Sequence, residues 1–434
     1  MKRKKLAALA CATATVALAA SACSSSKSTT GSSSSTSASG GGNVTVWLMT
    51  DAQSGWPTAV DGATKAYEAA HPGSKVTVDY QTWGTYLQKF EAAVKAGSTP
   101  DVIEFGNTDT VAPMAGGSLT DLSSVSSSFP NYSTWNAGLK ASCTYGGKTY
   151  CVPYYAADRM VGLNSKLASA AGISAAPTDW ATLVSDISKL NAKNTATKGF
   201  TGFHVDAGYE YLAMAFIEDA GGQIATQDSS GKWQMQFESA ADQTGLANFF
   251  KLFAASPNNS KNQNEAKQDT SFDNQTTAMM YGLSWEFAPP KGTTLPTVDY
   301  FNIPSPSKAG SFLPDFTGGS DLAVPAAAKN ASGGEEWLKD YTGNANETIM
   351  AQAGVIPNAS SLNSAITSTT SQTFAKGQDN PYFTPAAQNW ALINGTNNYI
   401  ENMLEAIAGA GGTSAAIASN TKSFDAQMDT ILNQ

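Results

Sequence analysis

The chain of 434 residues is 41% hydrophobic and 14% charged, and its 26 basic and 35 acidic side chains give a net charge of −9. An acidic surface repels phosphate backbones, which argues against nucleic acid as a partner. The length exceeds what a single hydrophobic core usually supports, so we expect two lobes.

The N-terminus has the layout of a secretory signal. Residues 2–5 are basic, Leu6–Ala20 is an uncharged apolar run, and small residues then lead to Cys23. The apolar run is too short for a permanent membrane span, so we predict a signal peptide over residues 1–22. The segment resembles a lipoprotein box, except that Ala20 stands where that motif usually has leucine. This predicts a lipid on Cys23; the alternative is an ordinary signal peptide in which Cys23 is incidental.

Residues 23–42 have the composition of a tether. From Ser24 to Gly42 the chain is almost entirely Ser, Thr, Gly and Ala, with one charge at Lys27. Such a segment buries too little apolar surface to offset its ordering entropy, so we expect a flexible linker. Removal of residues 1–22 leaves 22 basic and 35 acidic side chains, a net charge of −13. We predict a protein that is lipid-anchored at the extracellular face of the cell membrane.

The first folded segments alternate between strands and helices. Strands are expected at Val44–Met49, Val76–Tyr80 and Asp101–Phe105 from their β-branched and aromatic residues. Helices are expected from Pro57 to the residue before His71 and over Tyr86–Lys95. This alternation implies right-handed βαβ crossovers, and it predicts an α/β fold with mostly parallel sheets flanked by helices.

Two cysteines fall within the part of the chain expected to fold. Cys143 and Cys151 flank a predicted hairpin turn at Gly146-Gly147. In an oxidising compartment we expect a disulfide between them, worth about 2.5 kcal/mol on the chain-entropy model. Two free thiols are the alternative, and a metal site is disfavoured because no histidine or third cysteine is nearby.

The second half of the sequence carries more helix. Thr178 and Ser239 are candidate N-caps of two amphipathic helices, and a hairpin is expected to turn at residues 229–231. A short strand is expected at Asp321–Val324, and the last 45 residues have the pattern of two helices.

Several strings, in a fixed order, resemble the extracellular sugar-binding proteins of bacterial ABC importers. They are residues 46–51 (VWLMTD), 100–107 (PDVIEFGN), 147–155 (GKTYCVPYY) with Asn164, 277–285 (TAMMYGLSW), 318–325 (GGSDLAVP) and 354–358 (GVIPN). Residues 51–56, the cysteine hairpin and residues 153–159 look most like actinobacterial receptors for chitin-derived sugars such as chitobiose.

The resemblance implies a two-lobed, type II periplasmic-binding-protein fold with the ligand between the lobes. One lobe would comprise residues 43–156 and 306–342, and the other residues 157–305 and 343–434. It also implies a non-catalytic monomer that needs no cofactor or metal and hands its sugar to a membrane permease.

Sugars present apolar CH faces and a rim of hydroxyls, so a receptor needs aromatic surfaces and fixed polar groups. On the resemblance and on this chemistry, the expected ligand-binding residues are Asp51, Asn107, Tyr154, Tyr155, Asp158, Arg159, Tyr209, Tyr211, Trp285, Glu286, Gly318, Gly319 and Ser320. One of the two adjacent tyrosines is expected to face the cleft, because neighbours on a strand point to opposite sides.

Each of these residues also has a structural interpretation. Trp285 fits a core position, and residues 158–159 fit a surface ion pair. Asp51 and Asn107 are also common turn-forming residues. Tyr209 and Tyr211 could equally serve packing, and Gly318-Gly319-Ser320 could simply form a loop.

The competing hypothesis is a secreted glycosidase acting on similar sugars. Such an enzyme needs two carboxylates at a defined separation, one of them with a raised pKa, and Asp51 with Glu286 is a possible pair. The two histidines, His71 and His204, have no evident catalytic partner, and the sequence lacks G-x-S-x-G and H-E-x-x-H motifs. The receptor is therefore the favoured hypothesis.

Overall fold

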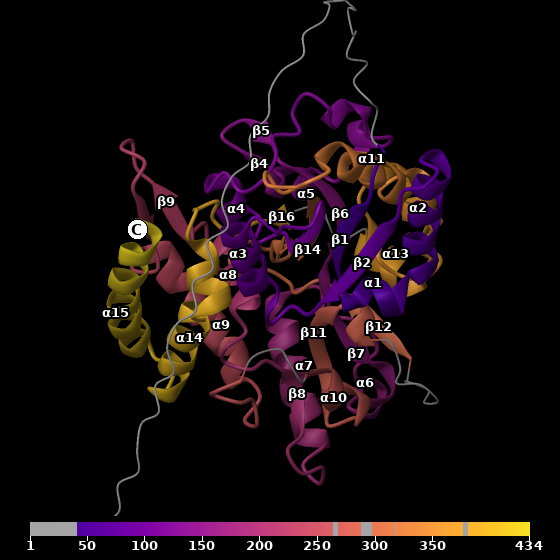
Figure 1. The fold of residues 1–434 in the computed structure, drawn as a ribbon. Helices are drawn as coiled ribbons and strands as arrows, with labels where there is room; N and C mark the ends of the chain where they lie inside the picture. The colour runs from indigo at the N-terminus through magenta and orange to yellow at the C-terminus, as the bar shows by residue number, and fades with distance from the viewer. Residues whose placement is uncertain (1–40, 264–267, 288–296, 317, 376–380) are drawn as a thin grey trace, which may run out of the picture. The chain divides into compact units, whose positions relative to one another are not determined.

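The computed structural model describes residues 41–263, 268–287, 297–316, 318–375 and 381–434 (Figure 1). The predicted signal peptide, the lipid attachment at Cys23 and nearly all of the linker lie outside these residues. Within the described part, no helix is both long and apolar enough to cross a membrane.

The first sheet has six strands in the order β15-β6-β14-β3-β1-β2. They are β1 (Val44–Met49), β2 (Val76–Gln81), β3 (Val102–Gly106), β6 (Cys151–Ala157), β14 (Gly318–Ala323) and β15 (Ile356–Pro357). β1 pairs in parallel with β2 and β3, whereas β14 pairs antiparallel with both β3 and β6. β15 is antiparallel to β6. Four strands therefore run one way and two the other, so the sheet is mixed, with antiparallel strands inserted where the chain returns to it.

The second sheet has four strands in the order β12-β7-β11-β8. They are β7 (Arg159–Asn164), β8 (Thr201–His204), β11 (Thr277–Leu283) and β12 (Val298–Phe301). β8 and β11 are parallel, and β7 runs antiparallel to both of its neighbours, β11 and β12. Three strands thus share one direction. The predicted α/β class is confirmed, although the pairing within both sheets is less parallel than the sequence pattern indicated.

Helices flank both faces of the first sheet. They are α1 (Thr50–Gly55), α2 (Pro57–Ala70), α3 (Tyr86–Ala96), α4 (Val111–Ala115), α5 (Ala137–Ser142), α11 (Ala331–Tyr341) and α12 (Asn344–Gln352). α2 packs against α11 and α12 over a core that includes Val46, Leu48 and Trp337. The other face buries Ile103 and Phe105 with residues of α3. β3 is buried on both faces: Val102 packs in one core and Ile103 and Phe105 in the other, as the two-residue period of a strand requires.

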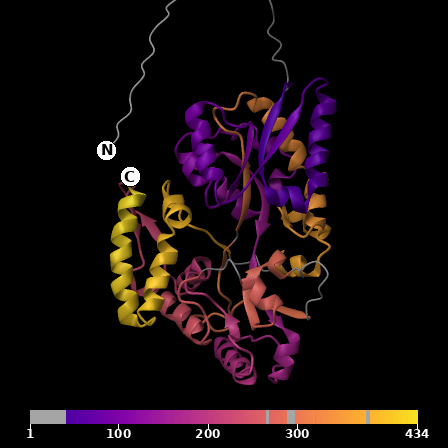
Figure 2. The same cartoon turned by 60° about the horizontal axis from the view of Figure 1, so that its bottom comes forward.

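Further helices cover the second sheet and extend to one side of it (Figure 2). They are α6 (Ser165–Ala170), α7 (Trp180–Lys193), α8 (Glu210–Asp219), α9 (Ala240–Ala254), α10 (Gln268–Asp273), α13 (Thr369–Ala375), α14 (Tyr399–Gly409) and α15 (Ser414–Leu432). α9 packs on α8, and α15 packs on α9 and on the hairpin of β9 (Ala225–Gln227) and β10 (Trp233–Met235). The predicted N-cap Ser239 is confirmed, but α7 is capped by Asp179, whose carboxylate accepts from Thr182 N, and not by Thr178.

The cysteine hairpin forms as predicted. β4 (Thr144–Tyr145) pairs with β5 (Lys148–Thr149), and Gly146 and Gly147 both have positive φ, as a tight primed turn requires. Cys143 and Cys151 form a disulfide that ties the end of α5 to the start of β6. The bond is fully buried, so it closes the hairpin onto the first sheet.

A single residue links the two sheets at one crossing. β6 ends at Ala157 in the first sheet and β7 begins at Arg159 in the second, so Asp158 alone separates them. The chain returns through the short strand β13 (Asp315–Phe316), which pairs with β16 (Pro381–Tyr382), before it enters β14.

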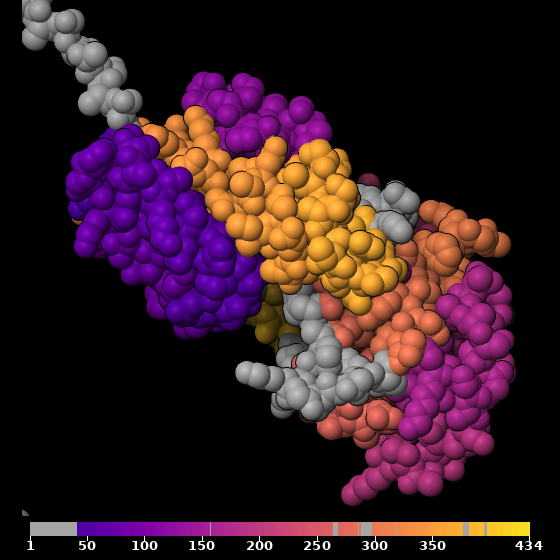
Figure 3. Space-filling view, turned by 90° about the vertical axis from the view of Figure 1, so that its right-hand side faces the viewer, coloured from indigo at the N-terminus to yellow at the C-terminus, as the bar shows by residue number. Residues whose placement is uncertain are grey.

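The division into two lobes stays a prediction, and the contacts of residues 344–365 argue for moving one of its boundaries. α12 packs on α2, and β15 joins the first sheet beside β6. In Figure 3 the orange surface of this region accordingly lies beside the indigo surface of the N-terminal segments. These residues belong with the first sheet, although the predicted boundary at residue 343 assigned them to the second lobe.

Candidate functional site

Polar and aromatic side chains gather where the parallel strands of the first sheet end. Asp51 follows β1, Trp83 follows β2 and Asn107 follows β3. Because β1, β2 and β3 are parallel, their carboxyl ends lie at one edge of the sheet, the usual binding edge of an open α/β sheet. The expectation for Asp51 and Asn107 rested on this geometry.

These three side chains line a cavity of about 570 Å³, which we call the main cleft. Its wall also contains residues of β14 and the 106–109 turn, together with residues of the second sheet and of β13. The described residues that line it are Asp51, Trp83, Gly106, Asn107, Thr108, Asp109, Tyr155, Arg159, Tyr211, Leu283, Phe316, Gly318, Gly319 and Ser320. Eight of the thirteen expected ligand-binding residues are in this set.

Trp83 provides an exposed aromatic face beside the cleft. Its side chain is 41% exposed, although large apolar side chains are mostly buried in this fold. The indole Nε1 donates a hydrogen bond of 2.7 Å to Asp51 Oδ2, and the edge of the ring packs against Tyr86 with an interplanar angle of 88°. The ring is therefore held in one orientation, and Asp51 positions it. An oriented, exposed aromatic ring is suited to stacking on a flat apolar ligand face.

Arg159 is the cation of the cleft, and it is nearly buried. Its Nε donates to Tyr209 Oη at 3.1 Å, and its guanidinium lies 4.7 Å from the centre of the Tyr211 ring. Tyr211 in turn stacks on Phe316, with ring centres 4.4 Å apart and 14° between the planes. These contacts fix a planar array of donors, the geometry that recognises paired acceptors.

The carboxyl of Asp315 lies behind Arg159. Asp315 Oδ2 accepts from the Arg159 backbone N–H at 3.3 Å, and Oδ1 accepts from Tyr281 Oη at 3.0 Å. Burial raises the pKa of Asp315 to about 7, and the hydrogen bond from Tyr281 and the charge of Arg159 oppose that increase. Asp315 thus holds the backbone of Arg159 in place and is not among the described residues that line the main cleft.

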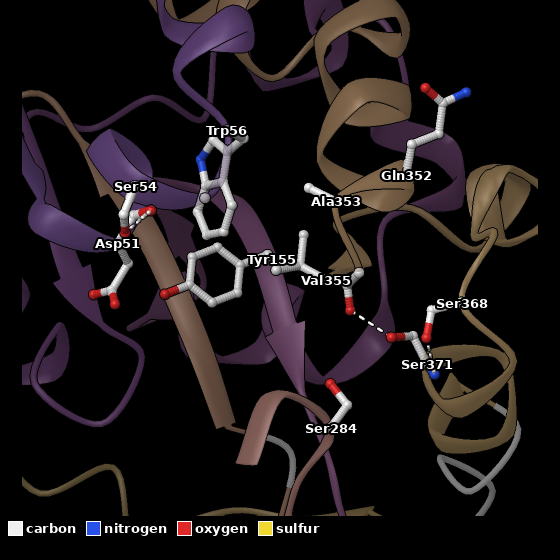
Figure 4. A pocket seen from close by; sticks show the side chains of 12 residues that line it. Asp51, Ser54, Trp56, Tyr155, Ser284, Gln352, Ala353, Val355, Ser368 and Ser371 are labelled. Atoms are coloured by element: carbon white, nitrogen blue, oxygen red, sulfur yellow. Dashed lines mark hydrogen bonds between the residues drawn. The ribbon is translucent and has the colours of Figure 1, made fainter. Parts of the chain in front are cut away.

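A second pocket of about 370 Å³ adjoins the main cleft, with which it shares Asp51 and Tyr155. Figure 4 shows Trp56 and Tyr155 on one side of it and Val355 on the other, with Ser284 below. Trp56 and Tyr155 pack edge to face, with ring centres 5.4 Å apart. The two cavities therefore have Asp51 and Tyr155 as a common wall.

The adjacent tyrosines do not point to opposite sides, although the alternation of a strand predicts that they do. Their rings pack edge to face with centres 4.8 Å apart, and both contact Trp56. The reason is a register shift of β6 against β14, where Ser320 pairs with Tyr155 but Asp321 pairs with Pro153. Tyr155 lines both pockets, whereas Tyr154 lies in the core, where its hydroxyl accepts from Trp56 Nε1 at 2.6 Å and is hydrogen-bonded to Tyr341. Burial raises the pKa of both tyrosines well above the usual value. Tyr154 therefore supports the Trp56 wall and does not face a ligand.

Three further expected residues are not among the described residues that line the pockets. Asp158 and Tyr209 are buried, and Tyr209 Oη donates to the backbone carbonyl of Tyr281 at 3.1 Å. Glu286 accepts from Gln268 Nε2 and from Leu283 N. Glu286 thus holds together the end of β11. The side chain of Trp285 lies outside the described part of the structure, so its role stays a prediction.

The glycines of β14 have a packing role. Gly319 has φ of +135°, and a Cβ there would lie 2.1 Å from the carbonyl oxygen of Tyr155. Its own carbonyl accepts from Asn107 N at 3.0 Å. The absence of a side chain lets β14 approach β6 closely, so that Tyr155 of β6 and Asn107 after β3 flank β14 in the cleft wall.

Sequence reasoning missed Trp83, Trp56, Phe316 and Asp109. Trp83 follows a parallel strand just as Asp51 and Asn107 do, so the rule that selected those two residues would also have selected it. Asp109 lines the cleft and accepts from Tyr86 Oη at 2.5 Å, and burial raises its pKa to about 6. Phe316 is brought to the site by the pairing of β13 with β16, which no local pattern shows.

Among the described residues, one group of side chains has the makeup of a metal site: Cys143, Cys151 and Asp321, whose ligand atoms lie within 4.8 Å of one another. The two sulfurs are bonded to each other, so they do not offer thiolates to an ion.

Residues 47–348 match the family model of bacterial extracellular solute-binding proteins. The chain belongs to this family. It is 29% identical over 379 residues to the diacetylchitobiose binding protein DasA of Streptomyces coelicolor, covering 84% of each chain.

Solved structures of other binding proteins share the fold. The GacH receptor of Streptomyces glaucescens aligns with a TM-score of 0.72 at 19% identity, over 90% of this chain and 98% of its own. The sugar-binding protein MalE of Xanthomonas citri aligns with a TM-score of 0.74 at 17% identity, over 90% and 97%. The fold is thus the type II periplasmic-binding-protein fold that the sequence predicted.

Proposed function

We propose that this solute-binding protein is the substrate-binding lipoprotein of an ABC transporter, which captures an oligosaccharide and delivers it to a membrane permease. The observation that carries the proposal is the composition of the main cleft. The rings of Trp83, Tyr155 and Tyr211 share one opening with the fixed polar groups of Asp51 and Arg159. A sugar, with apolar CH faces and a hydroxyl rim, is the ligand that such a surface fits.

Chitobiose or another N-acetylglucosamine-containing sugar is the favoured ligand. The support is the relative from Streptomyces coelicolor, which is named for diacetylchitobiose and matches across most of both chains. The cleft and the adjoining pocket, at about 570 and 370 Å³, fall in the size range of small-molecule sites.

Binding would act by a shift in population between open and closed arrangements of two lobes. The cleft wall draws Asp51 and Asn107 from the first sheet, and Tyr211 and Leu283 from segments around the second sheet. A ligand that contacts both sets favours the arrangement in which both are in reach, because only then are all contacts made. We would place residues 344–365 in the first lobe, on the contacts of α12 and β15.

The experiment is a titration of the purified protein with a sugar panel. The panel contains N-acetylglucosamine, diacetylchitobiose, chitotriose, cellobiose, maltose and trehalose, followed by tryptophan fluorescence and confirmed by calorimetry. Saturable one-to-one binding of one class supports the receptor and names its ligand. Failure of every sugar to bind at millimolar concentration would overturn the sugar-receptor proposal.

One observation favours a second candidate, a glycosidase. Asp51 and Asp109 line the same cleft, and burial raises the pKa of Asp109 to about 6, as a general acid requires. Against this, each carboxylate accepts a hydrogen bond from an aromatic side chain, Asp51 from Trp83 in the cleft wall and Asp109 from the buried Tyr86, which is a positioning role. A receptor is expected to leave diacetylchitobiose intact on long incubation. Steady release of monosaccharide that Asp109→Asn abolishes would establish the enzyme instead.

The lipid anchor is a separate part of the proposal. It rests on Cys23 and the linker composition alone. Mass spectrometry of the mature protein from its native membrane tests it: a diacylglyceryl modification on an N-terminal Cys23 is expected, and an unmodified Cys23 would leave a secreted, unanchored receptor.

A further inference from the structure

A third, smaller pocket opens from the main cleft at the cysteine hairpin, and we call it the side pocket. It shares Asn107, Thr108 and Phe316 with the main cleft, so the two cavities adjoin at these residues. Its volume is about 140 Å³. The inner wall is formed by Val111 and Met114 of α4 and by the chain just after β16.

The walls of the side pocket are fixed by packing. The ring of Phe383 lies against α5 at Gly138, where an added Cβ would be 2.4 Å from Phe383 Cζ. Phe383 follows Tyr382, which pairs with Phe316 in the β13–β16 ladder. Ser142, at the end of α5, donates to Asp321 Oδ1 at 3.1 Å. The pocket therefore has a defined shape before any ligand enters.

Polar groups stand at the margin of this pocket, and carbon lines its interior. Asn107 lies at the junction with the main cleft, and Ser142 and Thr144 lie at the hairpin end. Val111, Met114 and Phe316 are all less than a tenth exposed. A sugar hydroxyl placed among these apolar side chains would lose its hydrogen bonds to water, whereas a methyl group there gains about fourfold in affinity.

The volume limits the size of an occupant. At about 140 Å³ the side pocket is smaller than the main cleft and the second pocket. A short acyl substituent suits this small apolar space, whereas the hydroxyls of a sugar ring would lose their hydrogen bonds to water there. The occupant is therefore a substituent of the ligand, and the ring that carries it lies in the main cleft.

We propose that the side pocket is a subsite for the short acyl group of an N-acylated amino sugar, whose methyl enters the apolar interior and whose amide stays at the polar margin. The inference rests on the proposed function of the main cleft and deepens it. On this proposal the protein recognises the substituent at carbon 2 of the sugar. This substituent distinguishes diacetylchitobiose from cellobiose.

Variants that fill the side pocket from exposed positions test the proposal. Ala141 on α5 and Ala386 both line the pocket and are exposed, so Ala141→Leu and Ala386→Leu add volume without disturbing a core. Ala137→Leu is the matched control, because Ala137 is an exposed alanine of the same helix and is not among the described residues that line the pocket. Thermal unfolding of each full-length variant verifies the fold.

The readout is the ratio of dissociation constants for two disaccharides that differ at carbon 2. Wild type should bind diacetylchitobiose at least tenfold more tightly than cellobiose. Each filling variant should weaken diacetylchitobiose binding at least tenfold and change cellobiose binding less than twofold, and the control should change neither. If cellobiose binds too weakly to titrate, the N-propionyl analogue of diacetylchitobiose replaces it. The filling variants should then lose more affinity for this analogue than for diacetylchitobiose, because its acyl group is larger.

Two other results have different meanings. Equal weakening of both sugars, or no weakening of diacetylchitobiose by either filling variant, overturns the subsite while the receptor stands. If wild type binds no sugar of the panel, the proposed function fails and the subsite falls with it.

Discussion

Glu104 is a buried carboxyl whose titration should make the free energy of unfolding depend on pH. It lies on β3 with its side chain 1% exposed, and its Oε2 accepts from Met49 N at 2.8 Å. Burial raises the pKa of Glu104 from 4.5 to about 7, and the hydrogen bond from Met49 and the hydroxyls of Ser320 and Tyr155 oppose the increase. Asp51 adds a further, smaller rise.

The sign of the effect follows from proton linkage. Because the folded state holds the Glu104 proton more tightly than the unfolded chain, the group stabilises the fold fully below pH 4.5. That contribution is lost as the pH rises towards about 7. The pKa difference corresponds to about 3 kcal/mol in total, of which about 2–3 kcal/mol is lost between pH 5 and pH 8.

Urea unfolding of wild type and Glu104→Gln at pH 5 and pH 8 measures this contribution. Glutamine keeps an oxygen to accept from Met49 and does not titrate, so the loss of unfolding free energy between the two pH values should be smaller in the variant by about 2–3 kcal/mol. Asp315 and Asp321, whose pKa values burial also raises to about 7, titrate in both proteins and cancel in the comparison. Glu91→Gln, at an exposed position of α3, is the control for loss of one charge. The same pH dependence in wild type and Glu104→Gln would refute the reasoning.

The remaining predictions concern the cleft wall and the hairpin. Trp83→Ala should weaken sugar binding about tenfold, as expected for loss of one aromatic contact, and should leave the thermal midpoint nearly unchanged. Phe312→Ala is the matched control, because Phe312 is similarly exposed at 43% and is not among the described residues of the cleft. Calorimetry measures sugar affinity, and equal affinities of the two variants would contradict the stacking role of Trp83. Replacement of Cys143 and Cys151 by serine should lower the free energy of unfolding by about 2.5 kcal/mol in urea titrations, and a loss near zero would contradict the loop-closure argument. Arg159→Gln removes the cation that lowers the pKa of Asp315, so the variant should lose more stability at pH 8 than at pH 5, and a pH-independent loss would exclude that role.

The sequence predicted the elements of this fold well where a local signal existed. Pro57 starts α2, and Gly146-Gly147 turns the hairpin. Both rest on the fixed or permissive backbone of a single residue type, which acts regardless of tertiary context. The strand at residue 321 was predicted to run to residue 324, but it spans Gly318–Ala323, because its first residues are recruited by pairing with β6 rather than by their own β propensity.

The site was predictable only in part, for a related reason. Tyr154 and Tyr155 are indistinguishable in sequence, and strand alternation does not separate them, because the register of β6 against β14 shifts beside them. Glu286 follows a strand, as a binding residue often does, yet its carboxylate accepts hydrogen bonds from Gln268 Nε2 and Leu283 N nearby. Phe316 enters the wall through a contact with a segment that lies more than sixty residues away in sequence (Tyr382), and no local pattern carries that information.

The closure proposed above would rotate the two sheets about the single-residue link between β6 and β7, with Asp158 as the pivot. Arg159 lies next to this pivot, so such a rotation would scarcely displace its backbone. Trp83 follows β2, which lies four strands from β6, or about 19 Å at 4.8 Å per strand, and each 10° of rotation would carry that strand by about 3 Å. Substitutions next to Asp158 should therefore alter ligand affinity to the same extent at every opening angle. Substitutions near Trp83 should instead alter how far the two sheets close on each other. They should therefore alter the difference between loaded and empty protein that a permease could detect.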